Sequence, residues 1–376
     1  MRIGHVRKVY AGANSSIGFF SYYDQIIEPD CTRILVIKGG PGVGKSSLMK
    51  SISAVMQEKG LDVEHHCCSS DNDSIDGLVI PAIGVALLDG TAPHVVDPKN
   101  PGVVDEIIHL GDYWDESKLV GSKAEVIRCN RQVGRLFSVA YSRLREARVA
   151  HDEWESYISE SVHWPSIHNV TEEIHAQVFQ GITANYQREA KIRHLFANAI
   201  TPQGLVNYVS TLLSGYEHCY LLQGYPGTGK STILSSIVEK AKRVGLDCEV
   251  YHCPFDPQKI DLVFIKDLKT LFIAESELLK LDLSNHKLRQ QKIDLNEMIK
   301  DTLLSKWAPD ISSAKTRFWH VFQEAVKAVG RAKAYHDELE KYYIPHMDFS
   351  AINERRERIK ERILEYAKAQ KVLAPS

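Results

Sequence analysis

Residues 39–47 read GGPGVGKSS, and residues 224–232 read GYPGTGKST. Both stretches meet the spacing Gly-x-x-x-x-Gly-Lys-Ser, in which the glycines allow a tight turn whose backbone N–H groups converge on phosphate oxygens. Short apolar runs precede them, RILVIK at 33–38 and CYLLQ at 219–223, and apolar residues at helical spacing follow them. Each stretch is therefore predicted to be a phosphate-binding loop between a buried strand and a helix.

The two loops belong to an internal duplication. A shift of 185 positions aligns Lys45 with Lys230, and 17 of the 42 residues in 39–80 are then identical to those in 224–265. The same shift aligns HDEWESY, which begins at His151, with HDELEKY, which begins at His336. A repeat of about half the chain predicts two similar domains, residues 1–190 and residues 191–376.

The elements around the loops indicate the fold class. In each half a strand, a loop, a helix and a second strand follow one another, and such alternation predicts a parallel sheet covered by helices. Long charged segments with helical spacing follow in both halves, for example at 137–158 and 354–371. We therefore expect an α/β protein with two tandem P-loop NTPase domains, each carrying a long helical extension.

The predicted ligands of a nucleotide are the loop residues themselves. Lys45 and Lys230 would reach the β- and γ-phosphates, while Ser46 and Ser231 would offer hydroxyl groups to Mg²⁺. ATP is favoured over GTP partly because no guanine-reading Asn-Lys-x-Asp motif is present. The predicted nucleotide-binding residues are Gly39, Gly40, Pro41, Gly42, Val43, Gly44, Lys45, Ser46 and Ser47 in the first half and Gly224, Tyr225, Pro226, Gly227, Thr228, Gly229, Lys230, Ser231 and Thr232 in the second.

Hydrolysis also requires an acidic residue at the end of a strand, which holds the metal through its water shell. The apolar run that ends in Asp89 predicts this residue in the first half, although an aspartate that caps a strand turn has the same pattern. Asp71 and Asp256, at matched positions, could orient water, act as a base or take part in the Mg²⁺ shell, and each could equally be a turn-forming residue. His94 could sense the γ-phosphate or orient the attacking water. The predicted catalytic residues are Lys45, Asp89, Asp71 and His94, and the predicted metal ligands are Ser46, Asp89 and Ser231.

The second half departs from the first at this carboxylate. The shift of 185 positions places Ala274 where the first half has Asp89, and Glu275 follows one position late. A shift by one residue turns a strand side chain to the opposite face of the sheet. The second loop is therefore expected to bind a nucleotide while hydrolysis there is weakened.

Composition limits the other possibilities. A formal charge of −2 argues against a broad nucleic-acid-binding surface, and seven scattered cysteines do not suggest a disulfide framework. The N-terminal residues lack the apolar core of a signal peptide, and the apolar run at 78–88 is too short to span a bilayer. We expect a cytoplasmic protein whose partners are a nucleoside triphosphate and an unidentified small molecule or protein, with no membrane contact. The oligomeric state stays open.

With its two loops, DGTAPHVVDP at 89–98 and HLFANAITPQGLVNYV at 194–209, the sequence resembles an uncharacterised family of bacterial tandem P-loop ATPases. The resemblance covers nearly the whole chain and implies cytoplasmic ATP binding by two related domains. The segment FIAESELL at 272–279 departs from the DGT-PH pattern of that family, which puts activity of the second domain in doubt.

Three functional hypotheses follow from these features. The first is a Mg²⁺-dependent ATPase whose N-terminal site hydrolyses and whose C-terminal site binds nucleotide or regulates. The second is a small-molecule or nucleotide kinase, in which Asp71 would accept a proton from the acceptor hydroxyl group and the helical extension would act as a lid. The third is a non-enzymatic nucleotide sensor or scaffold that uses its long helices to hold a partner.

Overall fold

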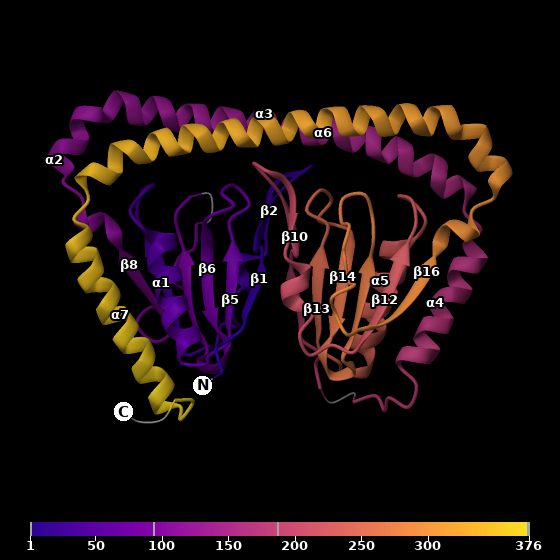
Figure 1. Ribbon diagram of the computed structural model, residues 1–376, viewed down its shortest axis with the longest axis horizontal. Helices are drawn as coiled ribbons and strands as arrows, with labels where there is room; N and C mark the ends of the chain where they lie inside the picture. Colours follow the sequence, from indigo (N-terminus) through magenta and orange to yellow (C-terminus); the bar gives the residue numbers. More distant parts are fainter. Residues whose placement is uncertain (1, 93–94, 186–187, 374–376) are drawn as a thin grey trace. The chain divides into compact units, whose positions relative to one another are not determined.

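The computed structural model describes residues 2–92, 95–185 and 188–373 of the chain (Figure 1). By their internal contacts these residues form two compact units. The first unit contains the residues up to Gly12, Tyr22–Ser138 and the residues from Ala328 onward. The second unit contains Ala13–Ser21 and Val139–Lys327. The predicted division at residue 190 follows the sequence repeat, whereas the compact units are assembled from segments of both halves.

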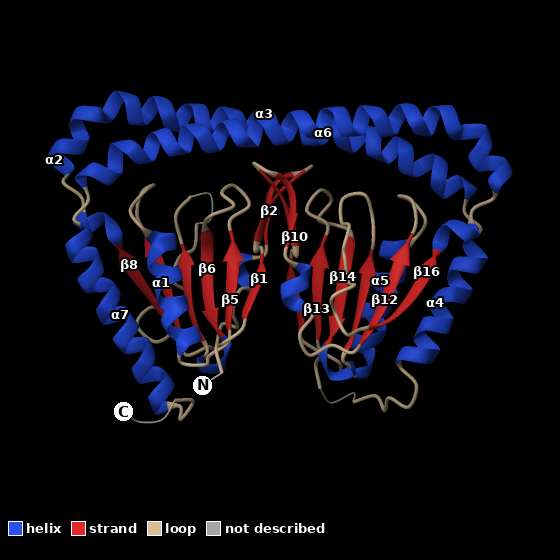
Figure 2. Cartoon of the chain, in the orientation of Figure 1, coloured by secondary structure: helices blue, strands red, loops and turns tan. Residues whose placement is uncertain are grey.

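A six-stranded sheet forms the centre of the first unit (Figure 2). Five of its strands run parallel, and β6 runs antiparallel to both of its neighbours. In spatial order the strands are β1 (Val6–Val9), β5 (Val63–Cys67), β6 (Ile75–Ile80), β7 (Val85–Asp89), β4 (Arg33–Lys38) and β8 (Asp105–His109).

The sheet of the second unit repeats this order and these directions. Its strands, matched one by one, are β9 (Ile192–Leu195), β13 (Cys248–His252), β14 (Ile260–Ile265), β15 (Thr270–Ala274), β12 (His218–Gln223) and β16 (Arg289–Asp294). The register is repeated as well, since Ile37 lies opposite Asp89 and Leu222 opposite Ala274. The structure therefore confirms a duplicated α/β fold.

The expectation of a purely parallel sheet is wrong for β6 and β14. Parallel neighbours need a crossover of about a dozen residues or more. Only Cys68–Ser74 separates β5 from β6, and the 3₁₀ turn Pro81–Ile83 with Gly84 separates β6 from β7. These links allow only antiparallel pairing, so the sequence supplies one reversed strand in each sheet.

Helices from both halves of the sequence cover the first sheet. Helix α1 (Lys45–Glu58) packs against β5, β6 and β7, and α7 (Phe349–Ala369) packs against α1. In Figure 1, α7 lies beside β8, and Arg362 of α7 forms an ion pair with Glu106 of β8 at 2.8 Å. The unit also contains the short α2 (Glu116–Leu119) and the ends of two long helices, α3 (Lys123–Ser161) and α6 (Asp301–Tyr343).

The second unit has the same plan. Helix α5 (Lys230–Val244) packs against β13, β14 and β15, and α4 (Trp164–Val178) packs against α5. The remaining parts of α3 and α6 belong to this unit, where Arg143 of α3 pairs with Glu324 of α6 at 3.2 Å. Two hairpins complete the described strands: β2 (Gly12–Ser15) with β3 (Gly18–Ser21), and β10 (Asn198–Thr201) with β11 (Gly204–Asn207).

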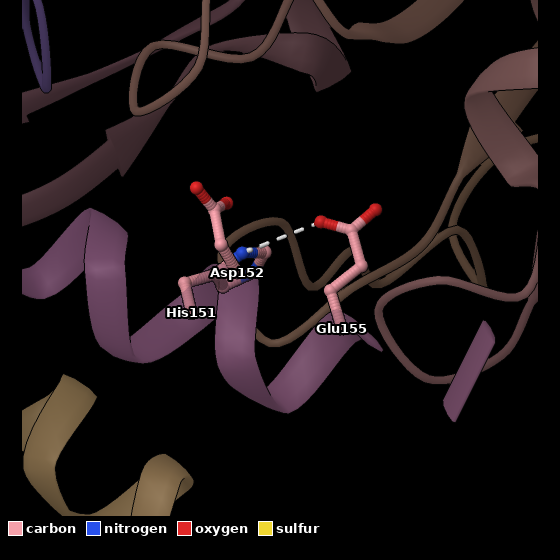
Figure 3. A group of neighbouring side chains, drawn as sticks. All are labelled: His151, Asp152 and Glu155. Carbon is pink, nitrogen blue, oxygen red and sulfur yellow. Dashed lines mark ion pairs between the residues drawn. The ribbon is translucent and has the colours of Figure 1, made fainter. Parts of the chain in front are cut away.

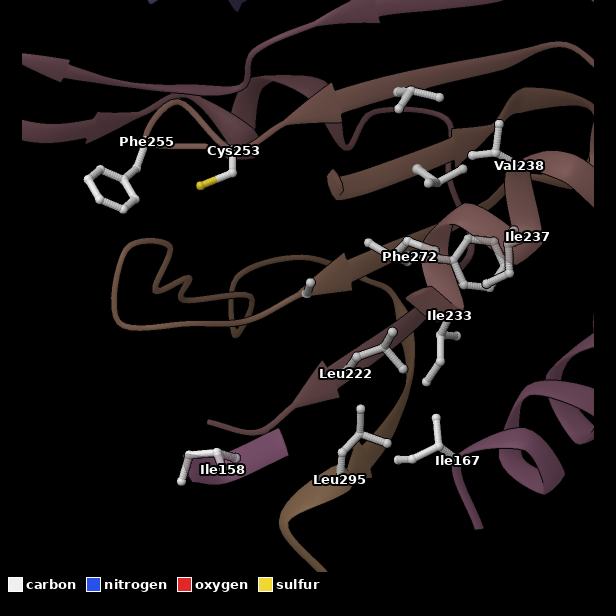
Figure 4. Packing of buried hydrophobic residues seen from close by; sticks show 14 of the residues in the cluster. Ile158, Ile167, Leu222, Ile233, Ile237, Val238, Cys253, Phe255, Phe272 and Leu295 are labelled. Atoms are coloured by element: carbon white, nitrogen blue, oxygen red, sulfur yellow. The ribbon is translucent and has the colours of Figure 1, made fainter. Parts of the chain in front are cut away.

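The helices that cover each sheet come from both halves of the sequence. Helix α4 comes from the first half of the sequence but packs in the unit built on the second-half sheet. Helix α7 comes from the second half and packs in the unit built on the first-half sheet. In Figure 4, Ile158 and Ile167 of the first half lie in one apolar core with Leu222 and Ile233 of the second. Each sheet is therefore covered partly by helices encoded in the other half.

Candidate functional site

The first glycine-rich loop, residues 39–47, connects the end of β4 to the start of α1. Gly44 precedes α1 with φ +87°, a conformation that favours glycine. The ammonium group of Lys45 donates to the carbonyl oxygens of Gly39 (2.9 Å) and Gly40 (3.0 Å) and lies 3.5 Å from Oδ2 of Asp89. The structure thus brings Lys45 and Asp89 together at the N-terminus of a helix, where the backbone attracts anions.

The second glycine-rich loop, residues 224–232, has the same conformation between β12 and α5. Gly229 precedes the helix with φ +92°, and the ammonium group of Lys230 donates to the carbonyl oxygens of Gly224 (2.5 Å) and Tyr225 (2.7 Å). Lys230 is only 9% exposed, and this burial lowers its pKa to about 8. Both lysines therefore fold back onto their own loops, each through hydrogen bonds to two loop carbonyl oxygens.

The serine of each loop forms an equivalent hydrogen bond. Oγ of Ser46 accepts from the backbone N–H of Ile75 (3.0 Å), and Oγ of Ser231 accepts from that of Ile260 (2.9 Å). These bonds link the first turn of each helix to the start of the antiparallel strand. Each hydroxyl group is consequently held at the end of the loop where a metal ligand is expected.

Asp89 and Ala274 occupy corresponding ends of β7 and β15. Oδ1 of Asp89 accepts from the N–H of Thr91 (2.9 Å), so this carboxylate both caps a strand turn and lies near Lys45. Ala274 is buried and offers only a methyl group. The carboxylate of Glu275 accepts from the side-chain amide of Gln223 (2.5 Å). The two sites therefore differ in the group that the strand end presents.

Asp71 and Asp256 both follow the second strand of their sheet and form turns. Asp71 accepts from Ser74 Oγ (2.9 Å) and lies 3.5 Å from Lys333 of α6. Asp256 pairs with Arg148 of α3 at 2.8 Å. In each unit the covering helix thus supplies a basic side chain to this aspartate. His94, the remaining predicted catalytic residue, lies outside the described residues.

Asp261 is a candidate ligand that the sequence interpretation missed. It is the second residue of β14, is 7% exposed, and has no hydrogen-bond partner for Oδ2 within the described parts of the chain. Burial raises its pKa to about 7, while a hydrogen bond with the Cys253 thiol and the charge of Lys230 oppose this increase. A buried carboxylate oxygen without a partner, beside a serine hydroxyl, is a donor set that suits Mg²⁺. The only sequence signal was the Ile-Asp pair repeated at 75–76 and 260–261.

A cavity of about 440 Å³ adjoins the second loop. Its volume falls within the usual range of small-molecule pockets. Polar walls come from the loop and its surroundings, including Lys230, Asp256, Lys259 and Asp261. The other walls are aromatic and come from α3, α4, α6 and the turn after β13; they are Trp154, Trp164, Phe255 and Phe318. The positions of the first unit that correspond by the shift of 185 hold Leu339, Phe349, Ser70 and Val133.

The repeated segment HDEWESY/HDELEKY places two clusters on the long helices. His151, Asp152 and Glu155 lie close together on α3 (Figure 3), and His336, Asp337 and Glu340 lie likewise on α6. Asp152 pairs with Arg148, and Glu155 pairs with both His151 (3.7 Å) and Lys259. Because basic side chains already balance these carboxylates, the first cluster does not require a metal ion. Burial lowers the pKa of His151 to about 4, so its ring is neutral at pH 7.

Within the described part of the chain, no helix combines the length and apolar character needed to cross a bilayer. All seven cysteines are free thiols. No protein family model, curated protein or solved structure matches the chain.

Proposed function

We propose that the protein binds a nucleoside triphosphate, most simply ATP, at both glycine-rich loops and hydrolyses it in a Mg²⁺-dependent reaction at the first. The observation that carries this proposal is the repeated strand–loop–helix geometry, with Lys45 and Lys230 each directed at the carbonyl oxygens of its loop. A glycine-rich turn without a ligand does not require the Gly-Lys-Ser sequence. Both units would then be P-loop NTPase domains of the tandem type that the sequence resembles.

At the first site, the loop N–H groups and the N-terminus of α1 would hold the phosphates, and Lys45 would contact the β- and γ-phosphates. Ser46 and Asp89 would hold Mg²⁺, Asp89 through the water shell of the ion. The bound metal neutralises negative charge that develops on the phosphate oxygens during transfer. The ammonium group of Lys45 would help to neutralise the same charge, because it lies 3.5 Å from Oδ2 of Asp89, the residue expected to hold the metal.

At the second site, Lys230 and Ser231 would hold the phosphates in the same way, while Ala274 leaves the strand end without a carboxylate. Asp261, whose buried Oδ2 has no hydrogen-bond partner among the described residues, would be a substitute ligand. We propose a site that binds nucleotide and regulates, rather than one that hydrolyses efficiently.

Titration of the purified protein with ATP and Mg²⁺ in a calorimeter tests nucleotide binding. Two equivalents are expected for the wild-type chain and one for Lys45→Ala or Lys230→Ala, because each substitution removes the main cationic contact of one loop. Mass spectrometry of co-purifying nucleotide provides an independent readout. Absence of binding to any nucleoside triphosphate would rule out the proposed function.

Nucleotide binding at the second site is expected to depend on pH. In Lys45→Ala, which isolates this site, affinity for Mg-ATP should fall below pH 7, because Asp261, with a pKa of about 7, becomes protonated and loses its capacity for Mg²⁺. Affinity should also fall above pH 8, because Lys230, with a pKa of about 8, loses its charge. Each limb approaches about a tenfold loss per pH unit in calorimetric titrations. Asp261→Asn should remove the acid limb and leave the alkaline one; an unchanged acid limb would contradict the assignment.

The cavity beside the second loop favours a second candidate function, the transfer of a phosphoryl group to a small molecule. Its aromatic walls suit a ligand with an apolar or planar part. Formation of ADP without free phosphate, only when a metabolite is added, would favour this kinase hypothesis. Tight ATP binding without turnover under any condition would instead favour a sensor or scaffold.

A further inference from the structure

The segments HDEWESY and HDELEKY lie 185 positions apart, and each is found in the unit that contains the loop of the opposite half. Glu155, in the first copy, belongs to the unit of the second loop, whereas Glu340 belongs to the unit of the first loop. Each unit therefore has a glutamate near its glycine-rich loop, and this glutamate comes from the other half of the sequence. Because a carboxylate repels phosphate, its presence in both units indicates a chemical role.

Glu340 packs directly on the first loop. A Cβ atom added to Gly42 would lie 3.3 Å from Cβ of Glu340 and 3.4 Å from its carbonyl oxygen. The carboxylate of Glu340 lies 3.7 Å from His336, and Lys333 is engaged by Asp337 and Asp71. Among the described residues, no lysine or arginine pairs with Glu340, so its oxygens remain available as hydrogen-bond acceptors.

Glu155 occupies the same place on the second loop but has a different partner. A Cβ atom added to Gly227 would lie 2.5 Å from the carbonyl oxygen of Glu155 and 3.1 Å from its Cγ. The ammonium group of Lys259 donates to Oε2 of Glu155. The first half has Ser74 at the position of Lys259, and its hydroxyl group bonds to Asp71 instead. Both carboxylates have a histidine 3.7 Å away, but among the described residues only that of the second site is also paired with a lysine.

This difference matters for hydrolysis. Attack by water forms a bond between its oxygen and the γ-phosphorus, breaks the bond to the β–γ bridging oxygen, releases ADP, and requires a group that accepts the proton of the water. A glutamate that packs on the loop and has no lysine or arginine partner among the described residues could orient the water and accept this proton. A carboxylate oxygen that already accepts from a lysine ammonium group is less available to accept a hydrogen bond from the attacking water.

We infer that Glu340, on α6 of the opposite half, is the catalytic group that orients and deprotonates the attacking water at the first site. Glu155 is its counterpart at the second site, where the hydrogen bond from Lys259 prevents it from taking this role. The inference rests on the proposed ATPase function. Two independent differences, Asp89 against Ala274 and Ser74 against Lys259, then assign hydrolysis to the same site.

Glu340→Gln tests this role because the amide preserves shape but cannot act as a base. Phosphate release is expected to fall about 10²-fold or more, with nucleotide stoichiometry and affinity unchanged. The matched control is Glu361→Gln, at an exposed position of α7, which should keep the wild-type rate. A wild-type rate in Glu340→Gln, or an equal loss of affinity and turnover, overturns the inference.

A gain-of-function variant tests whether Lys259 prevents Glu155 from acting at the second site. In a Lys45→Ala background, adding Ala274→Asp together with Lys259→Ser should raise phosphate release above that of Lys45→Ala alone, because the second site then carries both carboxylates. No increase, with nucleotide still bound at the second loop, would contradict the assignment of Lys259. If the wild-type chain binds ATP and releases phosphate but Glu340→Gln does so equally, only this inference fails. If the wild type does neither, the proposed function itself fails.

Discussion

Lys45→Ala is expected to abolish ATP turnover, whereas Lys230→Ala leaves a measurable rate. The ammonium group of Lys45 lies 3.5 Å from Asp89 and would stabilise the charge that develops on the transferred phosphoryl group. Loss of one such preorganised contact costs about 10²–10³-fold in rate. Lys230 serves the site whose strand ends in Ala274, so its removal should mainly eliminate one of the two bound nucleotides.

Steady-state phosphate release, measured together with calorimetric stoichiometry, separates these expectations. Each variant should bind one equivalent of nucleotide, and only Lys230→Ala should continue to release phosphate. A slower rate in Lys230→Ala, together with loss of any cooperativity that the wild-type chain shows toward ATP, would agree with a regulatory second site. The reverse pattern, turnover in Lys45→Ala and none in Lys230→Ala, would show that the roles of the two loops are exchanged.

Much of the fold was predictable from local patterns. The runs RILVIK and CYLLQ predicted strands that the structure confirms as β4 and part of β12, and the apolar spacing after each loop predicted α1 and α5. Repetition at a fixed shift predicted two similar domains, and strand order, direction and register agree with it. Such features depend on contacts between neighbours in sequence or on identity between halves, which a single chain displays.

The reversed strands were less accessible to sequence analysis. The apolar run at 78–88 hides two strands, because the turn at Pro81–Ile83 interrupts it without any polar residue. Periodicity alone does not distinguish one buried run from two short strands joined by a tight turn. The direction of β6 then follows from the lengths of its connections rather than from its own residues.

No local pattern in the sequence indicates that the covering helices are exchanged between the two halves. The charged pattern at 137–158 predicts a helix correctly, but helical spacing reveals only which face is apolar and not which sheet that face will cover. The HDE segments consequently indicate, from the sequence alone, only the register of the repeat. Their position over the opposite loops, and the burial of Asp261 beside Lys230, depend on tertiary contacts between distant segments.

Trp154→Ala is expected to destabilise the second unit by about 3–5 kcal/mol. Trp154 comes from the first half of the sequence but is 2% exposed in the core formed with the second-half sheet, and its ring lies 6.3 Å from that of Phe318. Truncation leaves a cavity among aromatic side chains that belong to three separate segments. The loss should appear as faster hydrogen exchange of the α5 amides, which report opening of the same core.

Two companion variants make this test specific to packing. Trp154→Phe should cost far less, because it keeps an aromatic ring and removes an indole N–H that has no hydrogen-bond partner among the described residues. Glu160→Ala, on the exposed face of the same helix, should leave α5 exchange unchanged. If Trp154→Ala also leaves α5 exchange unchanged, α3 does not contribute to this core in solution. An increased exchange rate would instead demonstrate that a helix encoded in the first half stabilises the sheet encoded in the second, the same exchange that brings Glu155 and Glu340 to the opposite loops.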